Sequence, residues 1–449
     1  MAVTPIDAIL VLLMILAQSL AWRYFLARLE SKFLRVLVNF LYIIANILGL
    51  YAVITVYLLD FNPPTSFLWN YVVRPGLIWE FVHLVWLVPA LIIKIFCHLV
   101  RREPKGLTGL FRAEKKGPRL LDPIGIVLII MLLFAFYGYG YQLAPPQVTR
   151  LSLNYEDLPK DLNGFTIALV SDFHYGRGQN FDDLNRSMAE LAELKPDIVF
   201  FLGNMVDDKS LLTNDFRGPM GALKNVPHGI YAVLGNYDHY TENPHNVTQL
   251  LTTAGARVLA NERVILDELP LSIIGFNDPG TKVFSLWPLS FPSQDIALPW
   301  SSLPGGLPPE GHFTILLNHR PVGIETAYLK GDVDLFLAGH TRGGIMQLPG
   351  YRGVNLASFF YDYSSGQYQV EGMEVFVTRG LAAPVSPFRL FAWPEIALIT
   401  LTGPQSPADP PKPSNNGDTN PSVPLGESPS TSPQGGDNSS AQNVEANGF

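Results

Sequence analysis

The chain has almost no cysteine: Cys97 is the only one among its 449 residues. A single cysteine excludes an intrachain disulfide bond and a cysteine-based zinc site. Charged residues are also scarce, at 16% of the chain, and the net charge of −8 provides no basic face for a polynucleotide. These shortages argue against a disulfide-stabilised domain and against a nucleic-acid-binding protein.

Apolar residues, by contrast, are abundant. They make up 48% of a 449-residue chain in which only 16% of the residues are charged, and this combination is too apolar and too long for one average soluble domain. Four apolar runs, each near the roughly 20 residues that cross a hydrocarbon core as a helix, cover residues 5–22, 36–59, 76–100 and 124–143. The first run lacks the positive n-region and the cleavage site of a signal peptide, so we expect it to be retained. Residues 1–144 are therefore predicted to form a bundle of four transmembrane helices.

The connections between these runs differ in charge. Residues 23–35 and 101–119 are rich in lysine and arginine, whereas residues 60–75 contain a single basic residue, Arg74. By the positive-inside rule, the first and third connections are cytoplasmic. The multi-pass topology then places everything after the fourth helix on the non-cytoplasmic side.

From residue 145 onward the pattern becomes that of a soluble α/β domain. Apolar segments that each break into polar residues occur at 165–174, 196–208, 229–240, 271–280, 313–321 and 333–344. Continuous apolar strands of this kind are covered on both faces, and residues 181–195 have helical spacing. A layered α/β sandwich is predicted for residues 145–402.

The C-terminal residues 403–449 have a different composition. They are dense in proline, serine, asparagine and glycine and contain scarcely any apolar side chain. Such a segment cannot bury a core, so we predict a disordered tail without a role in chemistry.

Polar residues follow the predicted strands at their carboxyl ends, where open α/β sheets place ligand sites. The side chains expected to meet on one rim are Asp172, His174, Asn204, Asn236, His319 and His340. Each has a plainer explanation when taken alone, because an aspartate after a strand often binds nearby backbone N–H groups. Their order and their common placement favour a shared site.

Five motifs carry a resemblance to a known family. They are Asp-Xaa-His at 172–174, Gly-Asn-Xaa-Val-Asp at 203–207, Gly-Asn-Tyr-Asp at 235–238, Asn-His-Arg-Pro at 318–321 and Gly-His-Thr-Arg-Gly-Gly at 339–344. The series resembles the calcineurin-like metallophosphoesterases, and most of all the branch whose catalytic domain follows membrane helices. The resemblance covers about residues 151–401. It implies a four-layer α/β sandwich that hydrolyses phosphate esters with two divalent cations and a bridging water.

The resemblance also implies roles for individual residues. Those that match ligands of the first metal are Asp172 and His174. Those that match ligands of the second metal are Asn236, His319 and His340. Two further acids, Asp207 and Asp238, match residues that usually support the loops.

Three positions depart from the family pattern. Asn204 stands where an aspartate bridges both metals, and a neutral amide is a weak shared ligand for two hard cations. Arg342 replaces a histidine ligand of the first metal by a permanent cation. Tyr237 replaces a histidine that steadies the phosphate and the leaving oxygen, and a small loop adjustment would let His239 take that role.

Two functions from different classes stay open. In the first, the chain is a slower hydrolase that keeps one metal at Asn204, Asn236, His319 and His340, while Arg342 grips the phosphate. In the second, it is an inactive descendant that binds an anion, a lipid headgroup or a protein partner, and the departures favour this reading over efficient two-metal catalysis. The cofactor is one or two divalent cations of unknown identity, or none. The expected partners are the bilayer and phosphorylated headgroups, without nucleic acid.

Overall fold

The computed structural model describes residues 31–53, the single residues 76, 79, 133, 137, 138 and 140, and residues 144–404 with gaps at 177–178, 207–215, 241–243, 281–283, 287–288, 292–297, 305, 307, 331–332, 349–350 and 383–388. The first apolar run, most of the third and fourth, Asp207 and the tail from residue 405 lie outside the described residues. Residues 36–53 of the second run lie in the helix α2 (Lys32–Val53). Among the residues that the structure describes, no helix has both the length and the hydrophobicity needed to span a membrane.

The described residues of the α/β domain form two six-stranded sheets. In spatial order, the strands of the first sheet are β1 (Gln147–Asn154), β16 (Glu395–Thr402), β2 (Thr166–Val170), β3 (Ile198–Leu202), β4 (Ile230–Val233) and β5 (Ala256–Val258). Those of the second sheet are β14 (Gly366–Val370), β15 (Met373–Val377), β11 (Leu335–Ala338), β10 (Phe313–Leu317), β7 (Leu271–Gly275) and β6 (Glu262–Leu266). Two small hairpins pair β8 (Phe284–Leu286) with β9 (Leu289–Phe291) and β12 (Gln347–Leu348) with β13 (Tyr351–Asn355).

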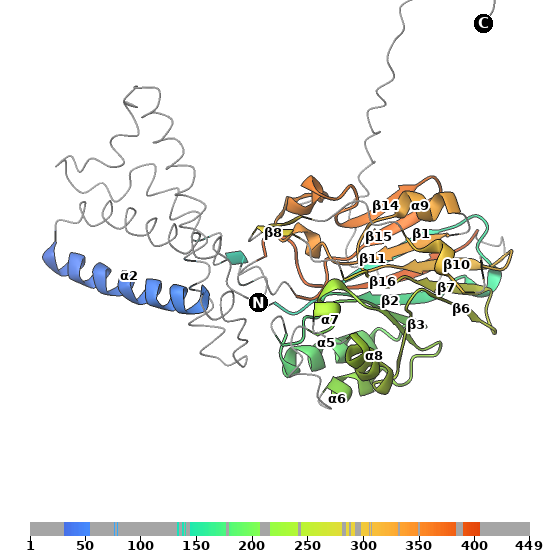
Figure 1. Cartoon of the computed structure of the whole chain (residues 1–449), viewed down its shortest axis with the longest axis horizontal. Coiled ribbons are helices and arrows are strands. Elements are labelled where there is room, and N and C mark those ends of the chain that lie inside the picture. The colour runs from blue at the N-terminus through green and yellow to red at the C-terminus, as the bar shows by residue number, and fades with distance from the viewer. Residues whose placement is uncertain are drawn as a thin grey trace, which may run out of the picture. The chain divides into compact units, whose positions relative to one another are not determined.

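The sheets pack face to face, and helices cover their outer faces (Figure 1). The helices on the outside of the first sheet are α5 (Phe181–Glu193), α6 (Arg217–Met220) and α8 (Pro244–Thr253). The second sheet is covered by α9 (Ile324–Lys330). This is the four-layer α/β sandwich that the resemblance predicts.

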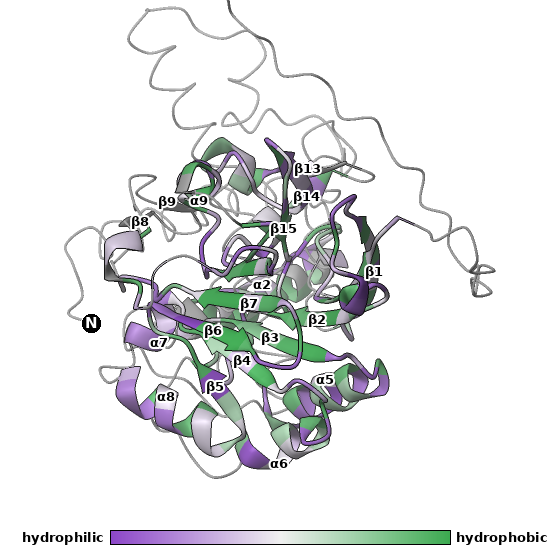
Figure 2. Ribbon diagram, turned by 90° about the vertical axis from the view of Figure 1, so that its right-hand side faces the viewer, coloured by the Kyte–Doolittle hydropathy of each residue, from purple (hydrophilic) through white to green (hydrophobic). Residues whose placement is uncertain are grey.

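Side chains along each strand point alternately to the two faces of the sheet, and this alternation produces the layers. In β2, Ile167 and Leu169 point into the core between the sheets, whereas Ala168 and Val170 point toward α5 and α8. Successive side chains of a strand face opposite sides, so a strand covered on both faces must be apolar throughout. The central strands accordingly form a continuous hydrophobic band in Figure 2, while the outer helices are hydrophobic on one side only.

The helix after β2 begins at a sequence-encoded cap. The Asn180 side chain accepts a hydrogen bond from the Asp183 backbone N–H, and the Asp183 carboxylate accepts one from the Asn180 backbone N–H. Together they form a capping box, which satisfies backbone donors that have no partner inside the helix. The helix predicted at 181–195 is thereby confirmed as α5.

The strand directions decide where the polar loops lie. Strands β2 to β5 run parallel in the first sheet, and β7, β10, β11 and β15 run parallel in the second. The loops that follow β2, β3, β4, β10 and β11 therefore collect at one rim of the sandwich. The six expected apolar strands are all present. The sequence did not predict β1, β6 and β14, because each of these strands is only partly buried.

Candidate functional site

The rim loops hold an unusual backbone. Five non-glycine residues of the motifs have positive φ angles, namely Asp172 (54°), His174 (49°), Asn204 (56°), His340 (67°) and Arg342 (54°). Such conformations cost of order 1–3 kcal/mol each and persist where the surrounding structure enforces them, often at functional sites. The side chains in question are the ones that the motifs single out.

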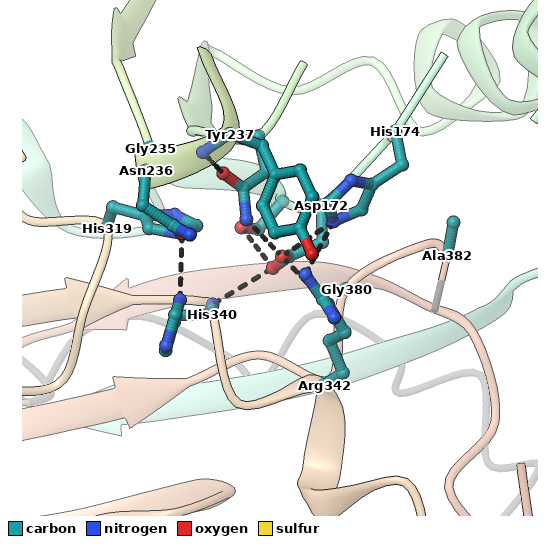
Figure 3. A network of polar contacts seen from close by, with 12 residues as sticks. Asp172, His174, Gly235, Asn236, Tyr237, His319, His340, Arg342, Gly380 and Ala382 are labelled. Atoms are coloured by element: carbon teal, nitrogen blue, oxygen red, sulfur yellow. Dashed lines mark hydrogen bonds and ion pairs between the residues drawn. The ribbon is translucent and has the colours of Figure 1, made fainter. Parts of the chain in front are cut away.

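Asp172, His174, Asn204 and Arg342 form one part of the site, here called the arginine half. Asp172 is fully buried, and its carboxylate accepts hydrogen bonds from Ser171 Oγ (2.8 Å), Asn204 Nδ2 (3.0 Å), the His340 backbone N–H (2.9 Å) and Arg342 Nε (3.3 Å). Figure 3 shows the guanidinium of Arg342 extended toward Asp172 and His174. The buried carboxylate thus has a permanent cation as its counterion.

Arg342 also engages His174. Its Nη2 lies 2.8 Å from His174 Nε2, and a guanidinium can only donate, so Nε2 must accept and the ring proton sits on Nδ1. The Nε2 lone pair, which would otherwise be available to a metal ion, is used by the arginine. Arg342 therefore lies within hydrogen-bond distance of both side chains that match first-metal ligands, whose nearest atoms, His174 Nε2 and Asp172 Oδ1, are 3.4 Å apart.

Asn204 completes this arrangement with both ends of its amide. Its Nδ2 donates to Asp172, and its Oδ1 accepts from the Tyr237 backbone N–H at 2.9 Å. An aspartate at position 204 would place a second carboxylate about one hydrogen-bond length from Asp172, which needs a cation between them. The amide removes that need, so Asn204 and Arg342 are mutually consistent replacements.

Tyr237 covers the arginine half. Its ring lies edge-on to His174, with centroids 4.9 Å apart, and the Arg342 guanidinium carbon is 5.6 Å from the Tyr237 ring centroid. At that distance the ring attracts the guanidinium through a cation–π interaction. Tyr237 thus helps to hold Arg342 in place.

The other part of the site, here called the imidazole half, consists of Asn236, His319 and His340. His319 Nδ1 lies 2.6 Å from the Leu202 carbonyl oxygen, so it donates and leaves a lone pair on Nε2. Asn236 Oδ1 and His340 Nδ1 lie 3.2 Å and 3.1 Å from that Nε2. In Figure 3 these side chains sit together on the opposite side of Asp172 from Arg342.

Burial and charge set the protonation states. Burial by itself would raise the pKa of the Asp172 carboxyl, but the positive charge of the Arg342 guanidinium holds that pKa well below its usual range. Burial lowers the pKa of His319, and burial together with His319 lowers the pKa of His340 well below its usual range. Both imidazoles are therefore neutral at pH 7, as metal ligands must be.

Asp238 links the two halves. Its buried carboxylate accepts backbone hydrogen bonds from Asn204 (2.8 Å), Met205 (2.8 Å), Val206 (3.3 Å) and Gly235 (2.8 Å). Burial raises the pKa of Asp238 to about 6, and the four N–H donors oppose that rise. Asp238 thereby ties the loop after β3 to the loop after β4.

Close approach of these loops requires glycine. A Cβ on Gly235 would lie 2.4 Å from Asn204 Oδ1 and 2.8 Å from His319 Cε1, and one on Gly203 would lie 2.5 Å from the Gly235 nitrogen. The two Gly-Asn motifs are therefore packing requirements as well as ligand positions.

Comparison with known proteins shows the family. The model of the calcineurin-like phosphoesterases matches residues 165–342, from β2 to Arg342. The uncharacterized metallophosphoesterase YkuE of Bacillus subtilis is 30% identical over 269 residues, which cover 59% of this chain and 89% of that protein. This chain belongs to the calcineurin-like metallophosphoesterase family.

Two vertebrate relatives carry the name "transmembrane protein with metallophosphoesterase domain". The Danio rerio protein is 29% identical over 284 residues, which cover 62% of each chain, and the Bos taurus protein is 27% identical over 299 residues, which cover 64% of each. The chain thus matches a little under two thirds of the length of these two proteins.

Metallophosphoesterases generally use divalent metals, so each half can be tested as a metal site. The arginine half does not fit one, because a guanidinium bonds both Asp172 and His174 and Asn204 presents its NH₂ group to the carboxylate. No group of three or more His, Cys, Asp or Glu side chains suited to a metal occurs in the described part of the chain.

The imidazole half fits better. Neighbouring ligands of an ion with bonds near 2.1 Å are roughly 3.0–3.4 Å apart, and the distances of 3.1 and 3.2 Å around His319 Nε2 lie in that range. The donors that would hold such an ion are Asn236 Oδ1, His319 Nε2 and His340 Nδ1. All three belong to the set that the motifs assign to the second metal.

His239 lies apart from both halves. Its Nε2 is 3.3 Å from Asn277 Oδ1, in the loop after β7, and Gly280 packs against its Cβ. The structure thus gives the imidazole a partner outside the metal ligands. Ser171 is a site residue that sequence reasoning missed, although its place directly before Asp172 was the available signal.

Proposed function

We propose that this chain is a membrane-associated metallophosphoesterase-family protein that binds phosphate-bearing ligands at its rim and does not perform two-metal hydrolysis. The observation that carries the proposal is the Arg342 guanidinium, which bonds both Asp172 and His174. A cation built into the protein stands where a first metal ion would otherwise neutralise the carboxylate. Without a first metal ion, the residue at position 204 has no two ions to bridge.

The buried charges support this proposal. Among the described residues, the buried carboxylates are Asp172, Asp238, Asp278 and Glu395, and the buried guanidiniums are Arg320, Arg342, Arg379 and Arg389. These charges balance without any metal. Two divalent cations together with a phosphate dianion would leave roughly two uncompensated positive charges in a buried setting, where each costs several kcal/mol. One divalent cation together with a phosphate dianion would leave the balance unchanged.

One metal ion in the imidazole half is accordingly part of the proposal. The convergence of Asn236, His319 and His340 also favours a second candidate function, a slow one-metal hydrolase. A divalent ion held by these residues would polarise a phosphoryl oxygen. Arg342 would then contribute positive charge beside the phosphate.

Membrane association completes the proposal. It rests on the apolar runs in residues 1–144 and on the names of the Danio rerio and Bos taurus relatives. The lysine- and arginine-rich connections favour a rim on the non-cytoplasmic side. A site held there would meet lipid headgroups and other exposed phosphate esters.

Metal content and turnover test the proposal together. The full chain and an Asn204→Asp, Arg342→His variant would be purified in detergent, analysed for metals and assayed with bis(p-nitrophenyl) phosphate. We expect at most about one divalent ion in the natural chain and about two in the variant, because the variant restores a shared carboxylate and an imidazole. Turnover by the natural chain with one ion would select the slow hydrolase. About two ions in the natural chain would overturn the proposal.

A further inference from the structure

Two residues that adjoin His340, one in the chain and one in space, carry buried hydroxyl groups, and neither hydroxyl takes part in the network described above. Thr341 follows His340 in the chain and is 7% exposed, and Tyr361 is 6% exposed. Within the described part of the chain, neither Thr341 Oγ1 nor the Tyr361 hydroxyl has a hydrogen-bond partner. A buried hydroxyl without a partner is costly, so its presence calls for an explanation.

Tyr361 is held against the site by packing. Its ring lies edge-on to His340 with centroids 5.8 Å apart, and its apolar neighbours are Val322, Ala357 and Phe360. The charged groups whose fields reach its hydroxyl include Arg320 and Arg342, beside Asp278 and Asp172. Phenylalanine would fill the same space without an unsatisfied hydroxyl.

Tyr368, in the same stretch of chain, differs from Tyr361 because its hydroxyl has hydrogen-bond partners. The Tyr368 hydroxyl accepts hydrogen bonds from the Ser364 and Ser365 backbone N–H groups, both at 3.0 Å, and donates to the Ser365 carbonyl at 3.1 Å. Tyr368 therefore has a structural use for its hydroxyl. For Tyr361 the local structure supplies none among the described residues.

We propose that the hydroxyls of Thr341 and Tyr361 donate hydrogen bonds to an oxygen of a phosphate group bound beside His340. The inference rests on the proposed function and adds ligand-contacting residues to it. Hydroxyl donors suit this position because they bind an anionic oxygen without adding charge to a balanced site. The ligand class is a phosphate or phosphate monoester that presents a free oxygen to the two hydroxyls.

The test is calorimetric titration of the full, metal-loaded chain in detergent with inorganic phosphate. The variants are Tyr361→Phe and Thr341→Val, each of which removes a hydroxyl and keeps most of the side chain's shape, and the matched control is Tyr368→Phe. We expect each of the first two to weaken phosphate binding roughly tenfold, as the loss of a hydrogen bond to a charged group does. The control should bind phosphate like the natural chain.

Thermal unfolding provides a second readout that does not depend on titration heats. Without phosphate, Tyr361→Phe should unfold at the same or a higher temperature than the natural chain, because it removes an unsatisfied polar group. Tyr368→Phe should unfold earlier both with and without phosphate. With phosphate, Tyr361→Phe should lose most of the ligand-induced rise in unfolding temperature.

The outcomes separate the two proposals. Phosphate binding by the natural chain with unchanged affinity in Tyr361→Phe and Thr341→Val would overturn the role of the hydroxyls and leave the proposed function standing. Failure of the natural chain to bind phosphate at all would overturn the proposed function, and the hydroxyl pair with it.

Discussion

The arginine half and the imidazole half match the two metal sites that the family resemblance implies, yet they satisfy their polar groups in different ways. In the arginine half, each donor faces an acceptor: Arg342 and Asn204 donate to Asp172, and Arg342 donates to His174. In the imidazole half, the lone pair of His319 Nε2 faces the Asn236 carbonyl oxygen at 3.2 Å. A carboxylate that already bonds a guanidinium has less need of a metal cation, whereas facing lone pairs favour one. This difference supports the proposal of a single metal ion in the imidazole half.

The largest effect should come from removing the built-in cation. Arg342→Met leaves Asp172 buried without its counterion, so we expect a loss of about 3–5 kcal/mol in the free energy of unfolding. Urea unfolding of the full chain in detergent measures this. The control is Arg186→Met, because Arg186 forms an exposed pair with Asp183 and should contribute below about 1 kcal/mol. A change of similar size in both variants would show that Arg342 is not a structural counterion.

The next largest effect concerns the imidazole half alone. His319→Ala removes the donor at its centre, and divalent-metal affinity should fall by at least about 100-fold, the upper end of the change caused by outer-shell partners of a ligand. Titration with Mn²⁺ or Zn²⁺ checks it. His312→Ala is the control, since His312 contacts Ser272 rather than the rim. Equal metal affinity in the two variants would contradict the assignment of a metal to this half.

A third variant acts on both halves. Asp238→Asn disturbs the carboxylate that ties the loops of Asn204 and Asn236 together, so we expect a stability loss of about 2 kcal/mol together with weaker metal and phosphate binding. Asp197→Asn is the comparison, because Asp197 also accepts a backbone N–H, from Thr166. It should lower stability without changing ligand binding. Ligand binding that survives in Asp238→Asn would show that the halves do not depend on this brace.

The smallest effect should come from His239, which lies outside both halves. His239→Ala removes a 3.3 Å contact to Asn277 and should change the free energy of unfolding by no more than about 1 kcal/mol. Metal content and phosphate affinity should stay as in the natural chain. A clear loss of phosphate binding would place His239 in the role that Tyr237 vacates.

Much of the domain could be predicted from sequence. The central strands are apolar throughout because both their faces are buried, and that pattern is visible without coordinates. The edge strands β1, β6 and β14 could not be predicted because their burial is only partial, and the partner of β1 also lies far away in sequence. For example, Gln147 of β1 pairs with Glu395 of β16. The membrane helices stay a prediction.

The site was predictable as a set of residues but not as a network. The motifs placed Asp172, Asn236, His319 and His340 at strand ends, and parallel strands bring such ends together. No sequence pattern linked Tyr361 to His340, because their contact depends on how the chain after β13 folds back over the rim. The hydrogen bonds of Asp238 agree with the loop-supporting role that the resemblance implies, whereas its four backbone partners could be identified only from the structure.

By itself, the sequence determined that Arg342 and Asn204 stand where metal ligands are expected, because side-chain chemistry follows from residue identity. Only the tertiary structure decided what they do instead. It placed one guanidinium within hydrogen-bond distance of both Asp172 and His174, 168 to 170 residues away along the chain. Coulomb attraction and hydrogen bonding depend on distance, and the distance between residues so far apart in sequence is set by the packing of the two sheets.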